Sequence, residues 1–195
     1  MISDTLKGVI FGGLLGLISG WGGLFIQSYI DELQDKGVAK EEIYAETRGI
    51  QETLRNSLYN LMESKLDVDY WTYRFKNLTP TDPKEHDQQN LSVEQFENDR
   101  NQFSIIVADL YRVTGKIRSI YRLTDKLKSA TNDLFLINEL SFKYKKIDEN
   151  KKPAMTELDQ WLSEERARVF SNANEQVDDR FKLLIEELEN QLLIN

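Results

Sequence analysis

The residues best suited to chemistry in this sequence are basic and lie in one short stretch. Six lysines and arginines, with a single acid, Asp125, fall between residues 112 and 128. At 3.6 residues per helical turn, five of the six occupy adjoining sectors of one helix face. These five are Arg112, Lys116, Arg118, Arg122 and Lys126. A stripe of this kind suits the phosphates of a nucleotide, an RNA or a lipid head group, so it is a candidate anion-binding site.

An internal role for the same cations competes with anion binding and is favoured. Residues 156–195 carry ten acids and four bases. The basic and acidic segments are therefore expected to pair within or between subunits. Exposed ion pairs of this type each contribute little stability.

Residues for catalysis, metal binding or cofactor binding are scarce. The chain has no cysteine and one histidine, which excludes disulfides, thiol nucleophiles, Cys-ligated metals and multi-histidine sites. We expect His86 to be an ordinary surface residue in a polar loop over residues 79–90. The Gly115-Lys116 pair is not a phosphate-binding loop, because Leu110 stands where the first glycine is required. We predict no catalytic residue, no metal and no cofactor.

Three acidic pairs also lack a convergent partner and are expected to be solvated. They are Glu41-Glu42, Asp67/Asp69 and Glu164-Glu165. The aromatic stretch Tyr70–Phe75 is interpreted as a hydrophobic plug under a loop, with a base-stacking platform or a membrane-surface contact as the alternatives.

The N-terminal part of the sequence contains an apolar segment that is rich in glycine. Seven of the ten glycines lie between Gly8 and Gly23, and Gly8–Ile30 contains no charged residue in 23 positions. A helix of that length spans about 34 Å, against about 30 Å for a hydrocarbon core. The flanks do not fit a cleaved signal peptide, and seven glycines cost too much in a water-soluble core helix. We therefore predict a transmembrane helix in an anchor region, residues 1–30.

The glycine spacing predicts close packing of this helix against another. Glycines recur every four residues and in a second, overlapping set that extends to Gly23; the positions with a predicted packing role are Gly8, Gly12, Gly16, Gly20 and Gly23. Small residues let membrane helices approach closely. Because the sequence offers no second span, the expected partner is another copy of the chain or another membrane protein. Such helices resemble those of homo-oligomeric membrane pores, and a tight dimer without a pore is the alternative.

Orientation follows from the basic residues that flank the segment. One lysine precedes it and three basic residues follow within 18 positions, which places the C-terminal part in the cytoplasm by the positive-inside rule. We expect a single-pass protein of the bacterial inner membrane, in contact with the lipid bilayer.

The remainder, residues 31–195, carries the full net charge of −8 and is expected to be an all-α bundle with long helices. Lys36-Gly37 is interpreted as a helix end, followed by a helix from about Ala39 to Leu66. Ser92 and Gln95 form a capping box that predicts the start of a third helix. This helix is expected to run to about residue 130, with a shorter helix to about Ile147 and a last long helix from Pro153 and Thr156.

This plan, one N-terminal span and a helical body, resembles the small accessory membrane effectors of bacterial antiviral systems of the CRISPR type. Some of these effectors are partners of RNA-guided RNases. These partner proteins form pores and carry a HEPN-type helical domain. The HEPN signature R-x4–6-H is absent, since Arg74 precedes His86 by 12 residues. The resemblance therefore implies a membrane role without RNase activity, and partners such as a cytoplasmic protein or a nucleic-acid-containing complex.

The function expected from the sequence is that of a membrane-anchored homo-oligomer that acts through its membrane assembly, as a pore-forming or membrane-depolarising effector. Two alternatives stay open. One is a non-conducting tether that recruits a partner through its helices, and the other is a nucleotide- or RNA-sensing membrane module.

Overall fold

The computed structural model describes the backbone of residues 4–78, 84–139 and 144–193. Within these ranges it describes side chains from residue 32 onward, apart from residues 33, 86, 138, 139 and 149. Four α-helices and two short 3-10 helices make up the fold: α1 (Asp4–Asn77), α2 (Lys84–Ile120), α3 (Asp125–Phe135), η1 (Leu136–Glu139), η2 (Glu149–Lys151) and α4 (Met155–Leu193). The described residues contain no strand, so the predicted all-α class is confirmed.

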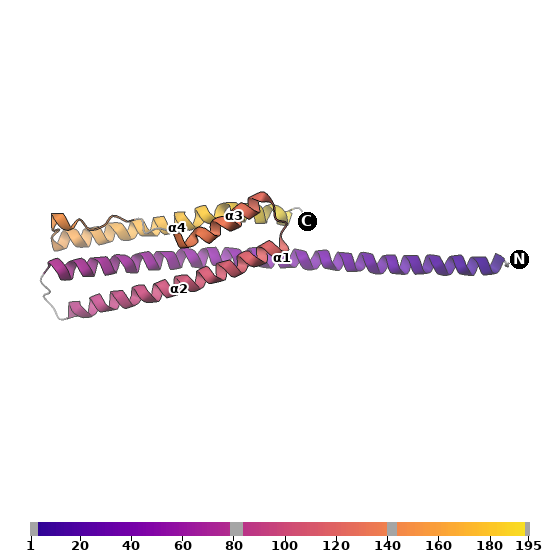
Figure 1. Cartoon of the computed structure of the whole chain (residues 1–195), viewed down its shortest axis with the longest axis horizontal. Helices are drawn as coiled ribbons and strands as arrows, with labels where there is room; N and C mark the ends of the chain where they lie inside the picture. Colours follow the sequence, from indigo (N-terminus) through magenta and orange to yellow (C-terminus); the bar gives the residue numbers. More distant parts are fainter. Residues whose placement is uncertain (1–3, 79–83, 140–143, 194–195) are drawn as a thin grey trace.

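Helix α1 is the central element of the bundle. Its C-terminal half packs against α2 and α4, while the short α3 packs mainly against α4 (Figure 1). The N-terminal part of α1 continues as a single helix past the end of the bundle (Figure 1).

Within the part of the chain that the structure describes, no helix is both long enough and apolar enough to cross a membrane. The predicted span Gly8–Ile30 falls where the structure gives the helical backbone but no side chains. The side chains of this span, and the five glycines with a predicted packing role, therefore lie outside the described residues.

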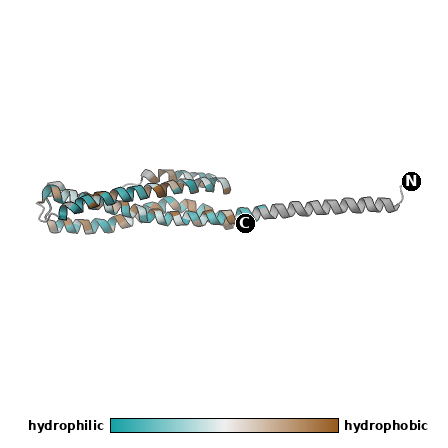
Figure 2. Cartoon of the chain, turned by 90° about the horizontal axis from the view of Figure 1, so that it is seen from below, coloured by the Kyte–Doolittle hydropathy of each residue, from teal (hydrophilic) through white to brown (hydrophobic). Residues whose placement is uncertain are grey.

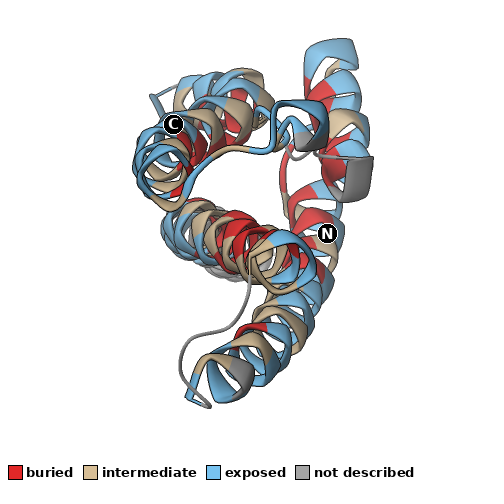
Figure 3. Cartoon of the chain, turned by 90° about the vertical axis from the view of Figure 1, so that its left-hand side faces the viewer, coloured by how far each residue is buried: buried red, intermediate tan, exposed pale blue. Residues whose placement is uncertain are grey.

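The core lies where α1, α2, α3 and α4 face one another. Buried residues lie on the inward sides of the helices (Figure 3), and hydrophobic bands alternate with hydrophilic ones along each helix (Figure 2). The largest fully buried side chains include Leu54 of α1, Ile117 of α2 and Phe181 of α4. Since burying one such side chain contributes about 1.5–3 kcal/mol, this core holds the bundle together.

Several predicted helix boundaries are wrong. Helix α1 runs through Gly37 without a break, and no described glycine has a positive φ. A glycine ends a helix when it adopts the left-handed conformation, which Gly37 does not. Helix α2 begins at Lys84, so Ser92 lies inside it; the Ser92 hydroxyl donates to the carbonyl of Gln89 at 2.8 Å rather than capping the helix.

The break between α2 and α3 is earlier than predicted. Helix α2 ends at Ile120, and α3 begins at Asp125 with Thr124 as its N-cap. The Thr124 hydroxyl accepts a hydrogen bond from the backbone N–H of Leu127 at 3.0 Å, as N-cap residues do. Helix α3 ends at Phe135 instead of continuing to Ile147. The last long helix begins at Met155, close to its predicted start.

Candidate functional site

Two of the five predicted anion-binding cations form ion pairs with helix α1. Arg112 and Lys116 of α2 each donate to a carboxylate oxygen of Glu46, both at 2.8 Å. The hydrogen bond from Lys116, the first of several contributions, lowers the pKa of Glu46, so this carboxylate is ionised at neutral pH. Both cations stay half-exposed while Glu46 is more covered. The α1–α2 pairing thus neutralises part of the predicted stripe.

The other three cations surround the turn between α2 and α3. Arg118 donates to the Asn132 side chain of α3 at 2.7 Å and lies over the ring of Phe135 at 5.1 Å. The Arg122 backbone bonds both ways with the amide side chain of Gln191, at 2.9 and 2.8 Å. Lys126, on α3, lies 3.7 Å from Glu187 of α4.

The expectation that all five cations share one helix face is wrong. Helix α2 ends at Ile120, so Arg122 and Lys126 lie beyond its end. Four of the five have a described side-chain partner. In the parts of the chain that the structure describes, Arg122 is the member whose side chain makes no hydrogen bond or ion pair. The internal pairing expected with residues 156–195 is observed for Lys126, whereas Arg112 and Lys116 pair with α1 instead.

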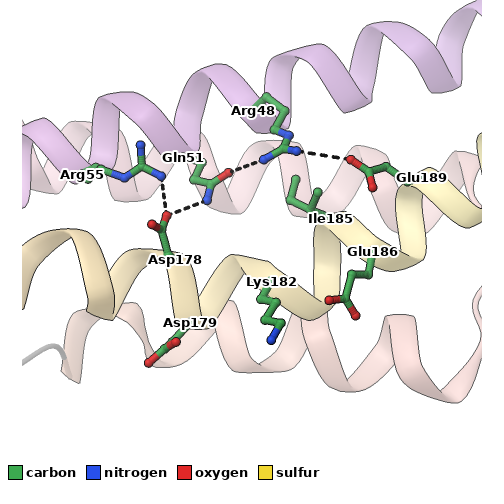
Figure 4. Close-up of a pocket in the computed structure, with 9 residues that line it drawn as sticks. All are labelled: Arg48, Gln51, Arg55, Asp178, Asp179, Lys182, Ile185, Glu186 and Glu189. Atoms are coloured by element: carbon green, nitrogen blue, oxygen red, sulfur yellow. Dashed lines mark hydrogen bonds and ion pairs between the residues drawn. The ribbon is translucent and has the colours of Figure 1, made fainter.

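A charged groove between α1 and α4 is the second candidate site (Figure 4). The groove is open to solvent and has a volume of about 420 Å³, and no local sequence pattern indicates it. Arg48 of α1 bonds Glu189 at 3.2 Å, and Gln51 donates to Asp178 at 3.0 Å. Arg55 also bonds the Asp178 carboxylate. These contacts tie α1 to α4 along one wall of the groove.

Three groove residues on α4 are free of such contacts. Asp179, Lys182 and Glu186 make no hydrogen bond or ion pair with any residue that the structure describes (Figure 4). The groove therefore offers solvent-exposed charges of both signs that have no described protein partner. Ile185 is the one apolar residue among those that line the groove. A wall of this composition does not suit an apolar small molecule.

A buried carboxylate holds the segment before α4 in place. Glu165 is 1% exposed, and its carboxylate accepts a hydrogen bond from the backbone N–H of Lys145 at 2.8 Å. Trp161 donates from its indole N–H to the carbonyl of Lys145 at 2.7 Å. We call residues 144–148 the strap. The expectation that Glu165 is solvated is wrong, because this side chain faces the strap and not the solvent.

Replacing Glu165 with alanine is expected to loosen the strap. The backbone N–H of Lys145 would lose its carboxylate acceptor, and losing a hydrogen bond to a charged group costs about 1.5–3 kcal/mol. Hydrogen exchange at the Lys145 amide should become faster, and the fluorescence of Trp161 should change. The matched control is Glu164→Ala, since Glu164 is exposed and, among the described residues, bonds only Gln160 of its own helix. Equal exchange in both variants would contradict this role of Glu165.

The aromatic stretch has the predicted plug role. Tyr70 and Tyr73 are buried against Leu158, with Ile147 of the strap packed on the same cluster. The Tyr144 hydroxyl of the strap bonds the Asp69 carboxylate, and burial together with this contact raises the pKa of Tyr144. These contacts make the stretch part of the core at the end of the bundle opposite the N-terminal part of α1.

The remaining predicted acids are distributed between solvent and ion pairs. Glu41 and Glu42 are exposed, as expected. Asp67 pairs with Arg166 at 2.8 Å, and burial raises the pKa of Asp67. His86 belongs to the backbone of α2 rather than to a loop, and its side chain lies outside the described residues. In the part of the chain covered by the structure, no group of three metal-ligating side chains is present.

Comparisons with protein-family models, with curated proteins and with solved structures find no match to this chain.

Proposed function

We propose that this chain is a membrane-anchored, homo-oligomeric helical protein that acts through its membrane assembly as a pore-forming or depolarising effector, of the kind used in bacterial defence. The observation that carries the proposal is the continuity of α1, from Asp4 to Asn77. The uncharged stretch Gly8–Ile30 and the central helix of the bundle are one helix. A movement of the bundle would therefore reach the membrane segment without an intervening hinge.

The glycine pattern supports self-association within the bilayer. Lipid provides no hydrophobic force between helices, so close backbone packing at small residues supplies the contact. The repeat Gly8, Gly12, Gly16 and Gly20 offers such a surface over three successive steps. A lumen lined by this segment would have no ring of charge, and its conduction would depend on wetting of a narrow apolar constriction.

The body of the protein would lie on the cytoplasmic side of the inner membrane. The three basic residues that follow the segment, Lys36, Lys40 and Arg48, support this orientation. The bundle residues would then be available to a cytoplasmic signal or partner.

A membrane-partition experiment tests the anchor. Arginine at the centre of a membrane helix costs about 2.5–3.5 kcal/mol, so Leu17→Arg together with Ile18→Arg is expected to move the chain from the alkali-resistant membrane pellet to the supernatant. The control is Ile105→Arg, at a position of α2 that is 57% exposed, and this variant should stay in the pellet. Recovery of the unmodified chain in the supernatant would overturn the proposed anchor.

A non-conducting tether is the second candidate, and exposed apolar groups on α4 favour it. Phe170 is 57% exposed beside Tyr59, with ring centroids 5.4 Å apart, and Leu193 is 84% exposed. Such groups suit contact with a partner protein. Ion flux from vesicles that contain the full-length chain separates the two candidates, because a tether conducts nothing.

The ligand-sensing alternative has weaker support from the geometry. Glu46 already occupies Arg112 and Lys116, and Asn132 occupies Arg118. A phosphate would have to displace these partners. The described contacts therefore favour the structural interpretation of the stripe.

A further inference from the structure

The exposed face of α1 in the bundle has the same phase as the glycine repeat of its N-terminal part. An α-helix completes about ten turns in 36 residues, so residues 36 positions apart lie on the same side. Four glycines each precede by 36 positions a residue that is exposed on α1. The pairs are Gly12 and Arg48, Gly13 and Gly49, Gly16 and Glu52, and Gly20 and Asn56.

Three bulky positions of the segment have the opposite phase. Three residues that are buried in the bundle follow Phe11, Leu15 and Ile18 by 36 positions. The buried residues are Thr47, Gln51 and Leu54. Gly12, Gly13, Gly16 and Gly20 therefore have the phase of the side of α1 that faces away from its own bundle.

This exposed face of α1 has two unlike edges. At one edge, Gly49 has open space around it, since an added Cβ would meet nothing within 4 Å. Asn56 follows on the same edge, exposed and without a described partner. The other edge borders the groove between α1 and α4, where Arg48 and Arg55 line the wall (Figure 4).

We propose that the groove between α1 and α4 receives the Gly49–Asn56 edge of α1 from a neighbouring copy of this chain. The inference rests on the proposed membrane homo-oligomer and adds its interface. Copies held in one bilayer run parallel, so glycine positions that meet in the membrane bring the exposed faces of α1 together above it. One edge then meets the opposite edge of the next copy, which is a head-to-tail contact of the kind that closes into a ring.

The chemistry of the two edges is complementary. Gly49 allows a close approach of the backbones, and Asn56 brings an amide that both donates and accepts hydrogen bonds. Across the contact, the unpartnered Lys182, Asp179 and Glu186 of the groove supply charged groups of both signs. An amide satisfies either sign without adding a net charge.

Cysteine cross-linking tests the contact, since the chain has no cysteine of its own. Gly49→Cys and Lys182→Cys are placed on separate full-length chains with tags of different mass, expressed together and oxidised in native membranes. A disulfide needs Cα atoms about 4.4–6.8 Å apart, so only a close contact gives a mixed product. We expect at least tenfold more mixed product than from the control pair Gly49→Cys with Gln102→Cys, at an exposed position of α2. Asn56→Cys replaces Gly49→Cys as a second probe of the same edge.

The oligomeric mass of the same samples distinguishes a failure of the interface from a failure of the proposed homo-oligomer. If the sample is oligomeric and yet gives no more mixed product with Lys182→Cys than with Gln102→Cys, this result would overturn the interface but not the proposed membrane assembly. Predominant cross-linking of Gly49→Cys to itself, as in a twofold dimer, also overturns the interface. A monomeric mass overturns both the interface and the proposed homo-oligomer.

Discussion

Gly16→Leu is expected to dissociate the full-length assembly and to abolish its effect on the membrane potential. The added side chain would separate helices that pack at the glycine positions. Van der Waals contact between closely packed backbones is the main interaction that holds such helices together in lipid. Insertion should be unchanged, since leucine is more apolar than glycine. Mass measured in detergent should fall to that of one chain, and a potential-sensitive dye should report at least a tenfold weaker response in cells.

Gly22→Leu is the matched control for this change. Gly22 precedes the buried Leu58 by 36 positions and lies about 120° around the helix from Gly16. The same increase in size there should leave the mass of the assembly unchanged. If Gly16→Leu keeps the mass and the effect of the unmodified chain, the role assigned to the glycine repeat is wrong.

Phe181→Ala is expected to destabilise the bundle by about 3–5 kcal/mol, the range for removing a large aromatic side chain from a core. Phe181 is fully buried on α4 and belongs to the cluster that joins all four helices. Chemical denaturation of the full-length protein in detergent, followed by tryptophan fluorescence, measures the loss as a lower midpoint.

Phe170→Ala is the control, because it makes the same change on the same helix at a residue that is 57% exposed. We expect the free energy of unfolding to change far less in this variant, since little apolar surface leaves the core. Equal midpoints for the two variants would contradict the described packing of α4.

The helical class and the apolar stripes were predictable because core residues recur at helical spacing. Leu54, Leu58 and Leu61 recur at such a spacing within the predicted helix from Ala39 to Leu66, and all three are buried. The break after Ile120 was missed, because the apolar spacing from Ile117 to Leu127 continues across the turn as if it were helix. The Thr124 cap was the local signal for this break.

Errors at helix ends arose from motifs that also occur inside helices. The spacing of Ser92 and Gln95 matches a capping box, yet both residues lie in the interior of α2. The sequence predicts a helix end at Gly37, but a glycine inside a long helix costs only about 1 kcal/mol. That cost is small beside the tertiary packing of α1.

The candidate sites were only partly accessible from the sequence. Glu46 was not identified as a partner, because its contact with Arg112 depends on how α1 and α2 are aligned. Glu165 did carry a signal, since it interrupts the apolar stripe between Leu162 and Val169. The groove combines residues more than 120 positions apart, which no local pattern predicts.

The mass and symmetry of full-length particles in detergent test the central claim most directly. The account predicts a ring of five or more copies in which the α1 helices surround the axis and the α2 and α4 helices lie outside them. A particle of one or two copies would contradict the claim that this protein acts through a membrane ring.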